Sequence, residues 1–515
     1  MTFQDLLNQD FGTLPDLIRI HGKNQADAPA LIQNDRVVSY GELDTMMDRV
    51  AAGLQRDGLK SRDIIAISAG TSIEYGMVFL GALRAGIAVA PLAPSSTADS
   101  LAMMIGDCGA KLLFLDADLA ATLAPAAGKV SATRISLDDS DAGRPFTDWL
   151  APADAKGEAV TLDPAQPFNI IYSSGTTGAP KGIVQSHQMR WQHMHLTERT
   201  FGCVSLISTG LYSNTTLVSF FPTLAGGGAV VLMAKFDVGK FLSLCETHAV
   251  THAMLVPVQY KRIMEYPDFD RFDLSKFIMK FCTSAPFAAE LKADVLRRWP
   301  GGLTEYYGMT EGGGGCVLLA HEHPDKLHTV GQPPEASIVL LIGEDGQPVA
   351  QGEVGEIVGH SASIMNEYWN QPGKTAEATW FDDQGRRFIR TGDVGRFDED
   401  GFLILMDRKK DMIISGGFNV YPSDLEGVLQ GHDAVAEAAV VGVSSDRWGE
   451  TPVAFITLKN GAAADAEAIR EWANGQLGKT QRIADIEILD VLPRSHIGKV
   501  LKRELRDAYK GKALA

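Results

Sequence analysis

The sequence predicts an α/β fold, and two observations carry this prediction. Short apolar runs such as DIIAIS, KLLFLD and FNIIYS alternate along the chain with longer helical patterns such as SLAMMIGDCG. Strands that alternate with helices are typical of largely parallel sheets. The length of 515 residues exceeds what one ordinary hydrophobic core organises, so we expect two or more domains.

The pattern of apolar stretches changes near Val330, and the new pattern predicts a β-rich segment. From there, short apolar stretches such as SIVLLIGEDGQPV, GEIVGH and GFLILM are joined by glycine and aspartate turns. A dense charge cluster, MDRKKD at 406–411, then separates two apolar strands, and it is either a solvated turn or a domain junction. About a hundred residues with αβ alternation follow it, which is enough for a small separate domain.

Composition is that of a globular, acidic protein. Hydrophobic residues make up 45% and charged residues 22% of the chain, and the formal net charge is −17. So acidic a chain is a poor candidate for nonspecific binding to nucleic acid or to an anionic membrane, and we expect neither as a partner. An anionic ligand must therefore be held by local donors.

Cysteine usage and the N-terminal residues favour a cytoplasmic protein. The five cysteines are widely spaced and form no Cys-x-x-Cys motif, which argues against a disulfide framework or a zinc site. The opening MTFQDLLNQDFG carries acids where a signal peptide carries a basic region. The uncharged run at 217–233 contains Pro222 and three glycines at 226–228. We expect a buried helix, a turn and a buried strand there rather than a membrane span.

A loop rich in glycine and hydroxyl side chains, SSGTTGAPKG at 173–182, follows the apolar strand FNIIYS. Glycines let the backbone approach an anion closely, and successive N–H groups in such a turn form an anion-binding nest. Hydroxyl groups, Thr177 among them, add donors, and Lys181 adds a positive charge. The loop is not a Walker A motif, because Pro180 occupies the place of its second glycine. A flexible Gly/Ser linker is the alternative, but a fixed proline and lysine after a strand favour a polyphosphate loop.

Four further stretches accompany this loop: YYGMTE at 306–311, RTGDVGRFDEDGFL at 390–403, DRKKDMIISGGFNVYPSDLE at 407–426 and PRSHIGKVLKREL at 493–505. In their order and spacing, these stretches strongly resemble the ANL superfamily of adenylate-forming enzymes. That superfamily comprises acyl-CoA synthetases, adenylation domains of nonribosomal peptide synthetases and firefly-type luciferases. The resemblance covers nearly the whole chain.

The resemblance implies a large N-terminal domain of layered αβαβα sheets at 1–408, which binds ATP and the acyl group and includes a β-rich subdomain at about 330–408. It implies a hinge at 409–411, with Lys410 at its centre, and a small mobile α+β domain at 412–515. By analogy with the superfamily, we also expect a homodimer.

The implied activity is that of an AMP-forming carboxylic acid–CoA ligase, which uses ATP, Mg²⁺ and coenzyme A. A carboxylate would attack the α-phosphate of MgATP to give acyl-AMP and pyrophosphate. The CoA thiol would then take the acyl group and release AMP. We expect an aryl acid, an aryl-alkanoic acid or a medium-chain fatty acid as substrate. The alternatives are an acyl-AMP ligase that delivers to a carrier protein and a luciferase-like oxygenase.

Residue roles are implied by the superfamily's motifs. Lys499 would bridge the acyl carboxylate and the α-phosphate, and Glu311 with Thr177 would serve the Mg²⁺ site and catalysis. Gly416 and Gly417 would border the CoA channel. Taken singly, Lys499 is a solvated lysine and Glu311 a surface acid after a turn, so the roles depend on the matched motifs. The nucleotide would contact Ser173, Ser174, Gly175, Thr176, Thr177, Lys181, Ser284, Ala285, Pro286, Tyr306, Tyr307, Gly308, Met309, Thr310, Asp393 and Arg408.

The acyl pocket is expected around LYSNTTLVSFF at 211–221. Ser213 stands where many acyl-CoA ligases carry histidine, and Phe418 stands where many relatives carry glutamate. The stretch has no acid, which disfavours an amino acid substrate, because a buried ammonium would lack a partner. The expected pocket residues are Tyr212, Ser213, Asn214, Val256, Gln259 and Gly308, with Phe220, Phe221 and Tyr260 as further candidates that ordinary core packing would equally explain.

Overall fold

The computed structural model describes residues 2–173, 180–194, 201–408, 411–415, 418–445, 449–459, 461–462, 464–478, 481–494 and 498–509, without the side chains of 407, 408, 414, 418, 419 and 449. The chain forms two compact units. Unit 1 comprises Met1–Leu327, Pro333–Ile338 and Gly359–Ile389, and unit 2 comprises His328–Gln332, Val339–Val358 and Arg390–Ala515.

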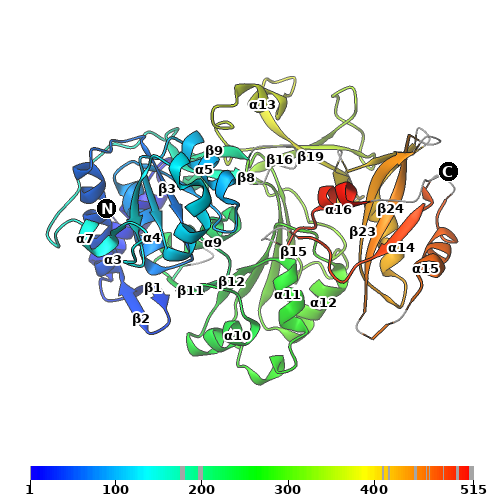
Figure 1. Cartoon of the computed structure of the whole chain (residues 1–515), viewed down its shortest axis with the longest axis horizontal. Coiled ribbons are helices and arrows are strands. Elements are labelled where there is room, and N and C mark those ends of the chain that lie inside the picture. The colour runs from blue at the N-terminus through cyan, green and yellow to red at the C-terminus, as the bar shows by residue number, and fades with distance from the viewer. Residues whose placement is uncertain are drawn as a thin grey trace. The chain divides into compact units, whose positions relative to one another are not determined.

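Unit 1 contains an eight-stranded sheet that is parallel except at its two edges (Figure 1). Its strands, in spatial order, are β15 (Cys316–Leu319), β14 (Gly302–Tyr307), β13 (Met279–Cys282), β12 (His252–Leu255), β10 (Val204–Ile207), β11 (Ala229–Leu232), β1 (Pro29–Gln33) and β2 (Arg36–Ser39). The central strands are buried, as expected of parallel strands covered on both faces.

A seven-stranded sheet in the same unit is also largely parallel, and it ends in the antiparallel hairpin of β8 and β9. Its strands, in spatial order, are β7 (Arg144–Pro145), β6 (Thr133–Ser136), β5 (Leu112–Leu115), β3 (Ile64–Ser68), β4 (Ala88–Pro91), β8 (Pro167–Ser173) and β9 (Lys181–Ser186). The predicted phosphate loop connects the two strands of this hairpin.

Helices of unit 1 alternate with these strands, as the sequence pattern predicts. They are α1 (Phe3–Leu7), α2 (Leu14–Asn24), α3 (Tyr40–Arg56), α4 (Ile73–Arg84), α5 (Ala98–Asp107), α6 (Ala117–Leu123), η1 (Ala124–Lys129), α7 (Phe146–Trp149), α8 (His187–Met194), α9 (Asn214–Ala225), α10 (Val238–Thr247), α11 (Pro257–Met264), η3 (Phe269–Arg271), α12 (Ala289–Arg298) and α13 (Pro372–Glu377). Many begin at a side-chain cap. Ser39, for example, accepts the Glu42 N–H, and Glu42 in turn accepts the Ser39 N–H.

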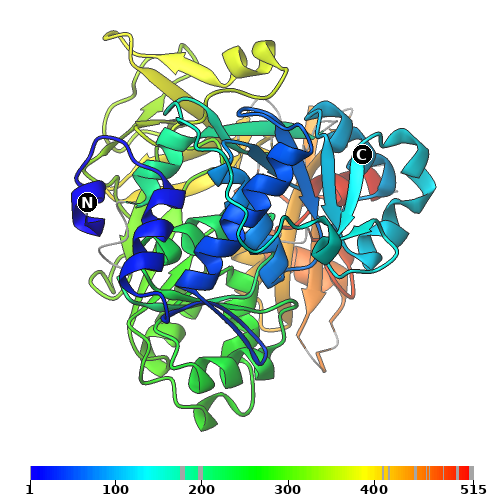
Figure 2. The same ribbon diagram turned by 90° about the vertical axis from the view of Figure 1, so that its left-hand side faces the viewer.

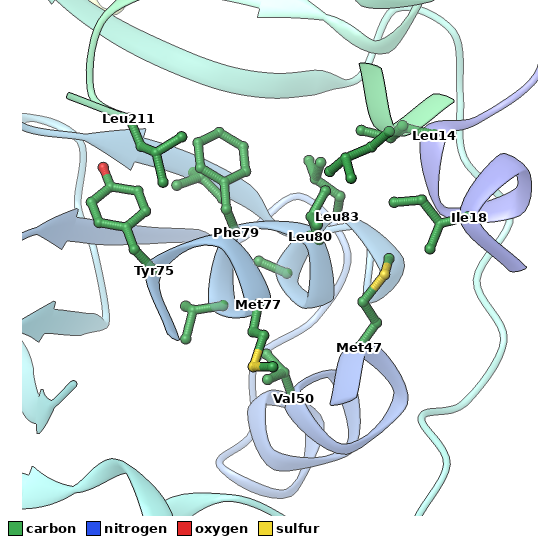
Figure 3. Packing of buried hydrophobic residues seen from close by; sticks show 14 of the residues in the cluster. Leu14, Ile18, Met47, Val50, Tyr75, Met77, Phe79, Leu80, Leu83 and Leu211 are labelled. Atoms are coloured by element: carbon green, nitrogen blue, oxygen red, sulfur yellow. The ribbon is translucent and has the colours of Figure 1, made fainter. Parts of the chain in front are cut away.

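One hydrophobic core joins the two large sheets of unit 1. It includes Leu31 and Val230 from the eight-stranded sheet and Ile65 and Phe168 from the seven-stranded sheet, all at most 1% exposed. Helices α2, α3 and α4 pack against one another (Figure 2). Their apolar side chains extend this core (Figure 3). This arrangement confirms the predicted layered α/β architecture, in which a sheet face must be covered by another layer.

The predicted helix, turn and strand at 217–233 are confirmed. Helix α9 ends at Ala225, the turn contains Gly227 with φ +74°, and β11 begins at Ala229. Pro222 lies inside α9, near its C-terminal end, and is buried. Among the described residues, no helix is both long and apolar enough to cross a membrane.

A five-stranded sheet follows in the β-rich segment. Its strands are β16 (Ser337–Ile342), β17 (Gly355–Ser361), β19 (Arg387–Phe397), β18 (Thr379–Phe381) and, paired with β19, β20 (Leu403–Arg408). The unit boundaries fall within β16, β17 and β19. The domain boundary predicted at 408 stays a prediction, and the predicted hinge at Lys410 lies outside the described residues.

The C-terminal part of unit 2 has a sheet and hydrophobic cores of its own. The strands are β22 (Phe418–Val420), β21 (Ile413–Ser415), β24 (Gly449–Leu458), β23 (Val435–Ser445) and β25 (Asp485–Ile488), and the helices are α14 (Pro422–Gln430), α15 (Ala466–Asn474) and α16 (Lys502–Ala508). Val440, Ile456 and Ile469 are fully buried in one of these cores. A separate core is what a small domain needs to be stable by itself.

Candidate active site

The β8–β9 hairpin holds the two ends of the predicted phosphate loop together. Ser173 ends β8 and Lys181 begins β9, and their Cα atoms face each other as a cross-strand pair. The predicted ligands that lie outside the described residues are Ser174, Gly175, Thr176 and Thr177. Antiparallel pairing therefore fixes where the loop leaves and re-enters the sheet.

An extended segment at 363–369 runs between β9 and the turn that follows β14. On one side, the Asn366 N–H donates to the Val184 carbonyl at 2.9 Å. On the other side, the Met365 N–H donates to the Glu311 carbonyl at 2.8 Å. The segment thus connects the exit of the phosphate loop to the YYGMTE motif by backbone hydrogen bonds.

The close approach of this segment to the motif requires glycine at Gly312. Its φ is +69°, a conformation that L side chains rarely adopt. A Cβ atom at this position would lie 1.9 Å from the Ser363 carbonyl oxygen. Any side chain here would therefore push the 363–369 segment away from Glu311.

Tyr368 contacts both Lys181, where the phosphate loop ends, and Glu311 of the YYGMTE motif. Its hydroxyl donates to Glu311 Oε1 at 2.7 Å, and the Lys181 Nζ atom lies 4.4 Å from the centre of its ring. Tyr368 is 3% exposed and Glu311 is 8% exposed. Burial and the neighbouring Glu311 charge raise the pKa of Tyr368, so the phenol keeps the proton that it donates.

Two predicted nucleotide segments leave the eight-stranded sheet at the same edge. Strands β13 and β14 are parallel neighbours, with Cys282 opposite Glu305, so the residues after each strand emerge side by side. Ligands of open α/β sheets commonly bind outside the carboxyl ends of the strands. The predicted residues at this edge are Ser284, Ala285, Pro286, Tyr306, Tyr307, Gly308, Met309 and Thr310, of which Pro286 and Gly308 are exposed and the others half-buried.

Ser284 has an unusual backbone conformation at this edge. Its φ is +83°, and its hydroxyl hydrogen-bonds the Thr215 hydroxyl at 2.6 Å. A non-glycine residue at positive φ costs conformational energy, and such residues gather at functional sites. The bond connects the predicted purine-side segment to the first turn of α9, where the acyl pocket is predicted.

The predicted acyl-pocket residues have different surroundings. Tyr212, Ser213 and Asn214 are half-buried at the start of α9, with Ser213 at the N-cap position. Gln259 is buried, and its amide is satisfied by hydrogen bonds at both ends. The amide oxygen accepts the Val256 N–H at 3.1 Å, and the amide nitrogen donates to the Ser208 hydroxyl at 3.1 Å. The Gln259 amide thus caps the N-terminus of α11, a structural role that the pocket prediction did not include.

Three further pocket candidates are corrected to core residues. Phe220 and Phe221 of α9 and Tyr260 of α11 are each 0% exposed. The two phenylalanines belong to the core between the large sheets, and Tyr260 stacks on Phe287. A side chain with no accessible surface offers none to a ligand, so these residues are not walls of a pocket.

In unit 2, strand pairing brings the two predicted ribose contacts together. Asp393 in β19 and Arg408 in β20 are opposed by their Cα atoms, and Asp393 is half-buried. The Asp393 N–H donates to the Thr391 hydroxyl oxygen at 3.0 Å, and that hydroxyl donates to the Ile357 carbonyl at 2.9 Å. These bonds fix the backbone that carries the carboxylate.

The predicted catalytic lysine lies close to the C-terminus. Lys499 is half-buried and directly precedes Val500, which forms a β-bridge with Arg494. The Arg494 guanidinium donates to the Gly498 carbonyl at 2.7 Å, so both flanks of the lysine are held. The predicted residues Lys410, Gly416 and Gly417, and the side chain of Phe418, lie outside the described part of the chain.

Sequence reasoning did not identify two buried residues of this region, Tyr368 and Arg190. Tyr368 lies in NEYWNQP, whose letters predict a turn before α13 and carry no catalytic pattern. Arg190 lies on α8 and is 1% exposed, which no pattern predicts for a charged residue.

Comparison with known proteins identifies the family. The family of AMP-binding enzymes matches residues 18–369, and the C-terminal domain of AMP-binding enzymes matches residues 424–499. A feruloyl-CoA synthase from an Amycolatopsis species is 32% identical over 98% of this chain and 99% of its own length. The fatty acid–[acyl-carrier-protein] ligase ScoC from Streptomyces coeruleorubidus is 30% identical over 97% of this chain and 97% of its own.

A solved structure extends this similarity to the whole fold. The crystal structure of ATP-bound MatB from Rhodopseudomonas palustris has a TM-score of 0.86 and 28% identity, covering 97% of this chain and 99% of that one. The chain belongs to the AMP-binding enzyme family. This confirms the predicted ANL superfamily and the predicted class, an AMP-forming acid–CoA ligase.

Proposed function

We propose that the protein activates an aryl or aryl-alkanoic acid with MgATP and transfers the acyl group to coenzyme A. The observation that carries this proposal is the meeting of Lys181 and Glu311 on Tyr368. A cation at the exit of a glycine-rich loop suits a phosphate, and a buried carboxylate beside it suits a divalent cation bound to that phosphate.

The residues present fit Mg²⁺ as the cation. Glu311 is a hard oxygen donor held in place by Tyr368, and among the described residues there is no cluster of three or more acid, histidine or cysteine ligands. One protein carboxylate suits Mg²⁺, which keeps several waters and takes other ligands from substrate phosphates. When bound, the ion neutralises charge that develops on those phosphates.

The adenylation step needs little covalent chemistry from the chain. A carboxylate oxygen of the substrate bonds to the α-phosphorus, and the bond to pyrophosphate breaks. Lys181 and the phosphate loop would hold the β- and γ-phosphates, Asp393 would accept the ribose hydroxyls, and Lys499 would stabilise charge on the α-phosphate. In the second step the CoA sulfur bonds to the acyl carbon, its proton leaves, and AMP departs.

The uncharged stretch in which the acyl pocket is predicted supports the choice of acid. Tyr212 is half-buried beside the start of α9, and the stretch from Leu211 to Phe221 contains no charged residue. An aromatic ring fits such a wall through stacked or edge contacts. The similarity to a feruloyl-CoA synthase supports the same choice, whereas the similarity to a carrier-protein ligase makes a carrier protein the second candidate acceptor.

Pyrophosphate release with a panel of acids tests the proposal. Ferulate, 4-coumarate, indoleacetate and octanoate are incubated with MgATP, with and without CoA, and products are identified by mass spectrometry. We expect aryl acids to give the highest kcat/KM and the corresponding acyl-CoA to appear. Release without any thioester would favour a carrier protein as acceptor, and preference for octanoate would contradict the aryl assignment.

Replacing Tyr368 with phenylalanine should weaken the response to Mg²⁺. The variant keeps the ring beneath Lys181 but loses the hydrogen bond to Glu311. A hydrogen bond to a charged group is worth about 1.5–3 kcal/mol, so the Mg²⁺ concentration for half-maximal adenylation should rise about tenfold or more. Tyr509→Phe is the matched control, because Tyr509 donates to Asp485 at 2.9 Å within unit 2. An unchanged Mg²⁺ dependence in Tyr368→Phe would contradict the role.

A further inference from the structure

Arg190 is a buried cation whose hydrogen bonds within the described part of the chain all go to neutral partners. Its Nε donates to Asn169 Oδ1 at 2.9 Å, and its Nη2 donates to Gln185 Oε1 and to Asn214 Oδ1, the latter at 2.9 Å. Among the residues that the structure describes, its Nη1 has no hydrogen-bond partner, although the atom is buried. Burying a charge without a counter-ion is costly, so a folded protein that retains one calls for an explanation.

Aromatic rings surround the guanidinium but do not neutralise it. The Arg190 Cζ atom lies 5.8 Å from the ring centre of Phe168 and 5.5 Å from that of Phe221. Burial, followed by the Arg190 charge, lowers the pKa of His193 to about 3, so this imidazole stays neutral. Burial lowers the pKa of Arg190 itself to about 9, which leaves the guanidinium charged at pH 7.

The local fold places Arg190 beside the end of the β8–β9 hairpin that lies away from the phosphate loop, where Asn169 and Gln185 form a cross-strand pair. The loop leads into β9, and Ser186, the last residue of β9, caps the N-terminus of α8 by accepting the Met189 N–H at 3.0 Å. Arg190 follows in the first turns of α8. From here the guanidinium reaches back to Gln185 on β9 and across to Asn169 on β8.

The partners of Arg190 lead to both predicted substrate sites. Gln185 donates through Nε2 to the Thr310 carbonyl at 2.7 Å, directly before Glu311. Asn214 is the first residue of α9, beside the predicted acyl pocket. Each amide oxygen accepts from Arg190, so the guanidinium determines which way both amides point. One side chain therefore connects the nucleotide motif to the acyl-pocket helix.

We propose that Arg190 is a positioning residue for adenylation, and that its charge favours the two anionic reactants. Through its hydrogen bonds to Gln185 and Asn214, it would fix the position of the Thr310 backbone relative to the start of α9. The substrate carboxylate and ATP would supply the negative charge that the described residues around Arg190 do not provide. The inference rests on the proposed function, because only there are both reactants anions.

Two substitutions separate the hydrogen bonds from the charge. Arg190→Lys keeps the positive charge but loses the planar fork that holds three amides. Its kcat for pyrophosphate exchange should fall about tenfold, with the KM values close to those of the wild type. Arg190→Gln removes the charge, and the KM values for both ferulate and MgATP should rise about tenfold, which corresponds to about 1.4 kcal/mol each.

Arg84 provides the matched control. It is a half-buried arginine of α4 whose side chain is 8% exposed and is paired with Asp44 at 2.6 Å and Asp48 at 3.0 Å. Because these carboxylates already balance its charge, Arg84→Gln should lower the melting temperature and leave both KM values unchanged. A merely structural Arg190 would behave in the same way, with reduced stability and unchanged KM values, and that result would overturn the proposal.

A binding measurement keeps this test separate from the proposed function. The rise in melting temperature that MgATP alone induces is compared between wild type and Arg190→Gln, each relative to its own ligand-free value. A smaller rise in the variant supports the proposal, and an equal rise overturns it. Wild-type protein that MgATP stabilises, but that shows no pyrophosphate exchange with any acid, would instead count against the proposed substrates.

Discussion

Lys499→Ala should lower the rate of acyl-AMP formation by about 10²–10³, the usual cost of losing one donor to developing charge. Attack on the α-phosphorus builds negative charge on its equatorial oxygens, and a positioned ammonium stabilises that charge more than it stabilises bound substrate. The flanking bridge between Arg494 and Val500 does not involve the Lys499 side chain, so the variant should fold. The measurement is pyrophosphate exchange under saturating MgATP and acid.

The second half-reaction distinguishes this role from a general loss of function. Synthetic acyl-AMP supplied with CoA bypasses the step that needs Lys499, so thioester formation should stay near the wild-type rate. Lys502→Ala is a matched control from the same segment, because Lys502 is paired with Glu426 at 2.8 Å. It should leave both half-reactions largely intact. Equal losses of both half-reactions in Lys499→Ala would contradict the assignment.

Much of the fold could be predicted because local patterns agreed with the tertiary structure. The runs IIAIS and LLFL became β3 and β5, which are buried on both faces, and the glycines after α9 became the turn into β11. Continuous apolar runs bounded by turn residues are typical of parallel strands. The loop and motif residues were predicted by resemblance, since single residues such as Lys499 carry no signal of their own.

The contacts of the site were less predictable, since they depend on pairing between distant segments. Tyr368 reaches Glu311 across 57 positions in the sequence, through a segment that carries no periodicity. Periodicity also cannot separate a pocket wall from core on α9, which is uncharged and buried nearly all round, and Phe220 and Phe221 proved to be core. For Gln259 the local signal was only partial: Pro257 marks the start of α11 and glutamine follows the N-cap by three positions, but the N-cap Val256 has no oxygen to complete a capping box.

Glu311→Gln should lower adenylation by about 10², because it removes the one charge that the proposal assigns to Mg²⁺ while keeping the shape of the side chain. The glutamine oxygen can still accept a hydrogen bond from the Tyr368 hydroxyl, so the variant keeps this bond with a neutral acceptor. A neutral amide is a weaker ligand for a hard cation than a carboxylate. The expected signature is a higher Mg²⁺ requirement with a folded protein.

The buried acid Glu305 provides the control for stability. It lies on β14, six positions before Glu311, and forms an ion pair with Lys292, while burial raises its pKa above the usual range. Glu305→Gln leaves the Lys292 ammonium without its counter-ion, so the melting temperature should fall. The Mg²⁺ requirement should not change, because no role in binding the ion is assigned to Glu305.

The two variants together decide whether Glu311 binds the ion or only supports the turn. Melting temperatures are compared with ATP and EDTA and with ATP and excess Mg²⁺. In the wild type and in Glu305→Gln, Mg²⁺ should increase the stabilisation by ATP, because the ion and the nucleotide bind together. In Glu311→Gln that increase should largely disappear. If Mg²⁺ still adds the full stabilisation there, Glu311 is not a ligand, and its bond to Tyr368 serves the packing of the 363–369 segment.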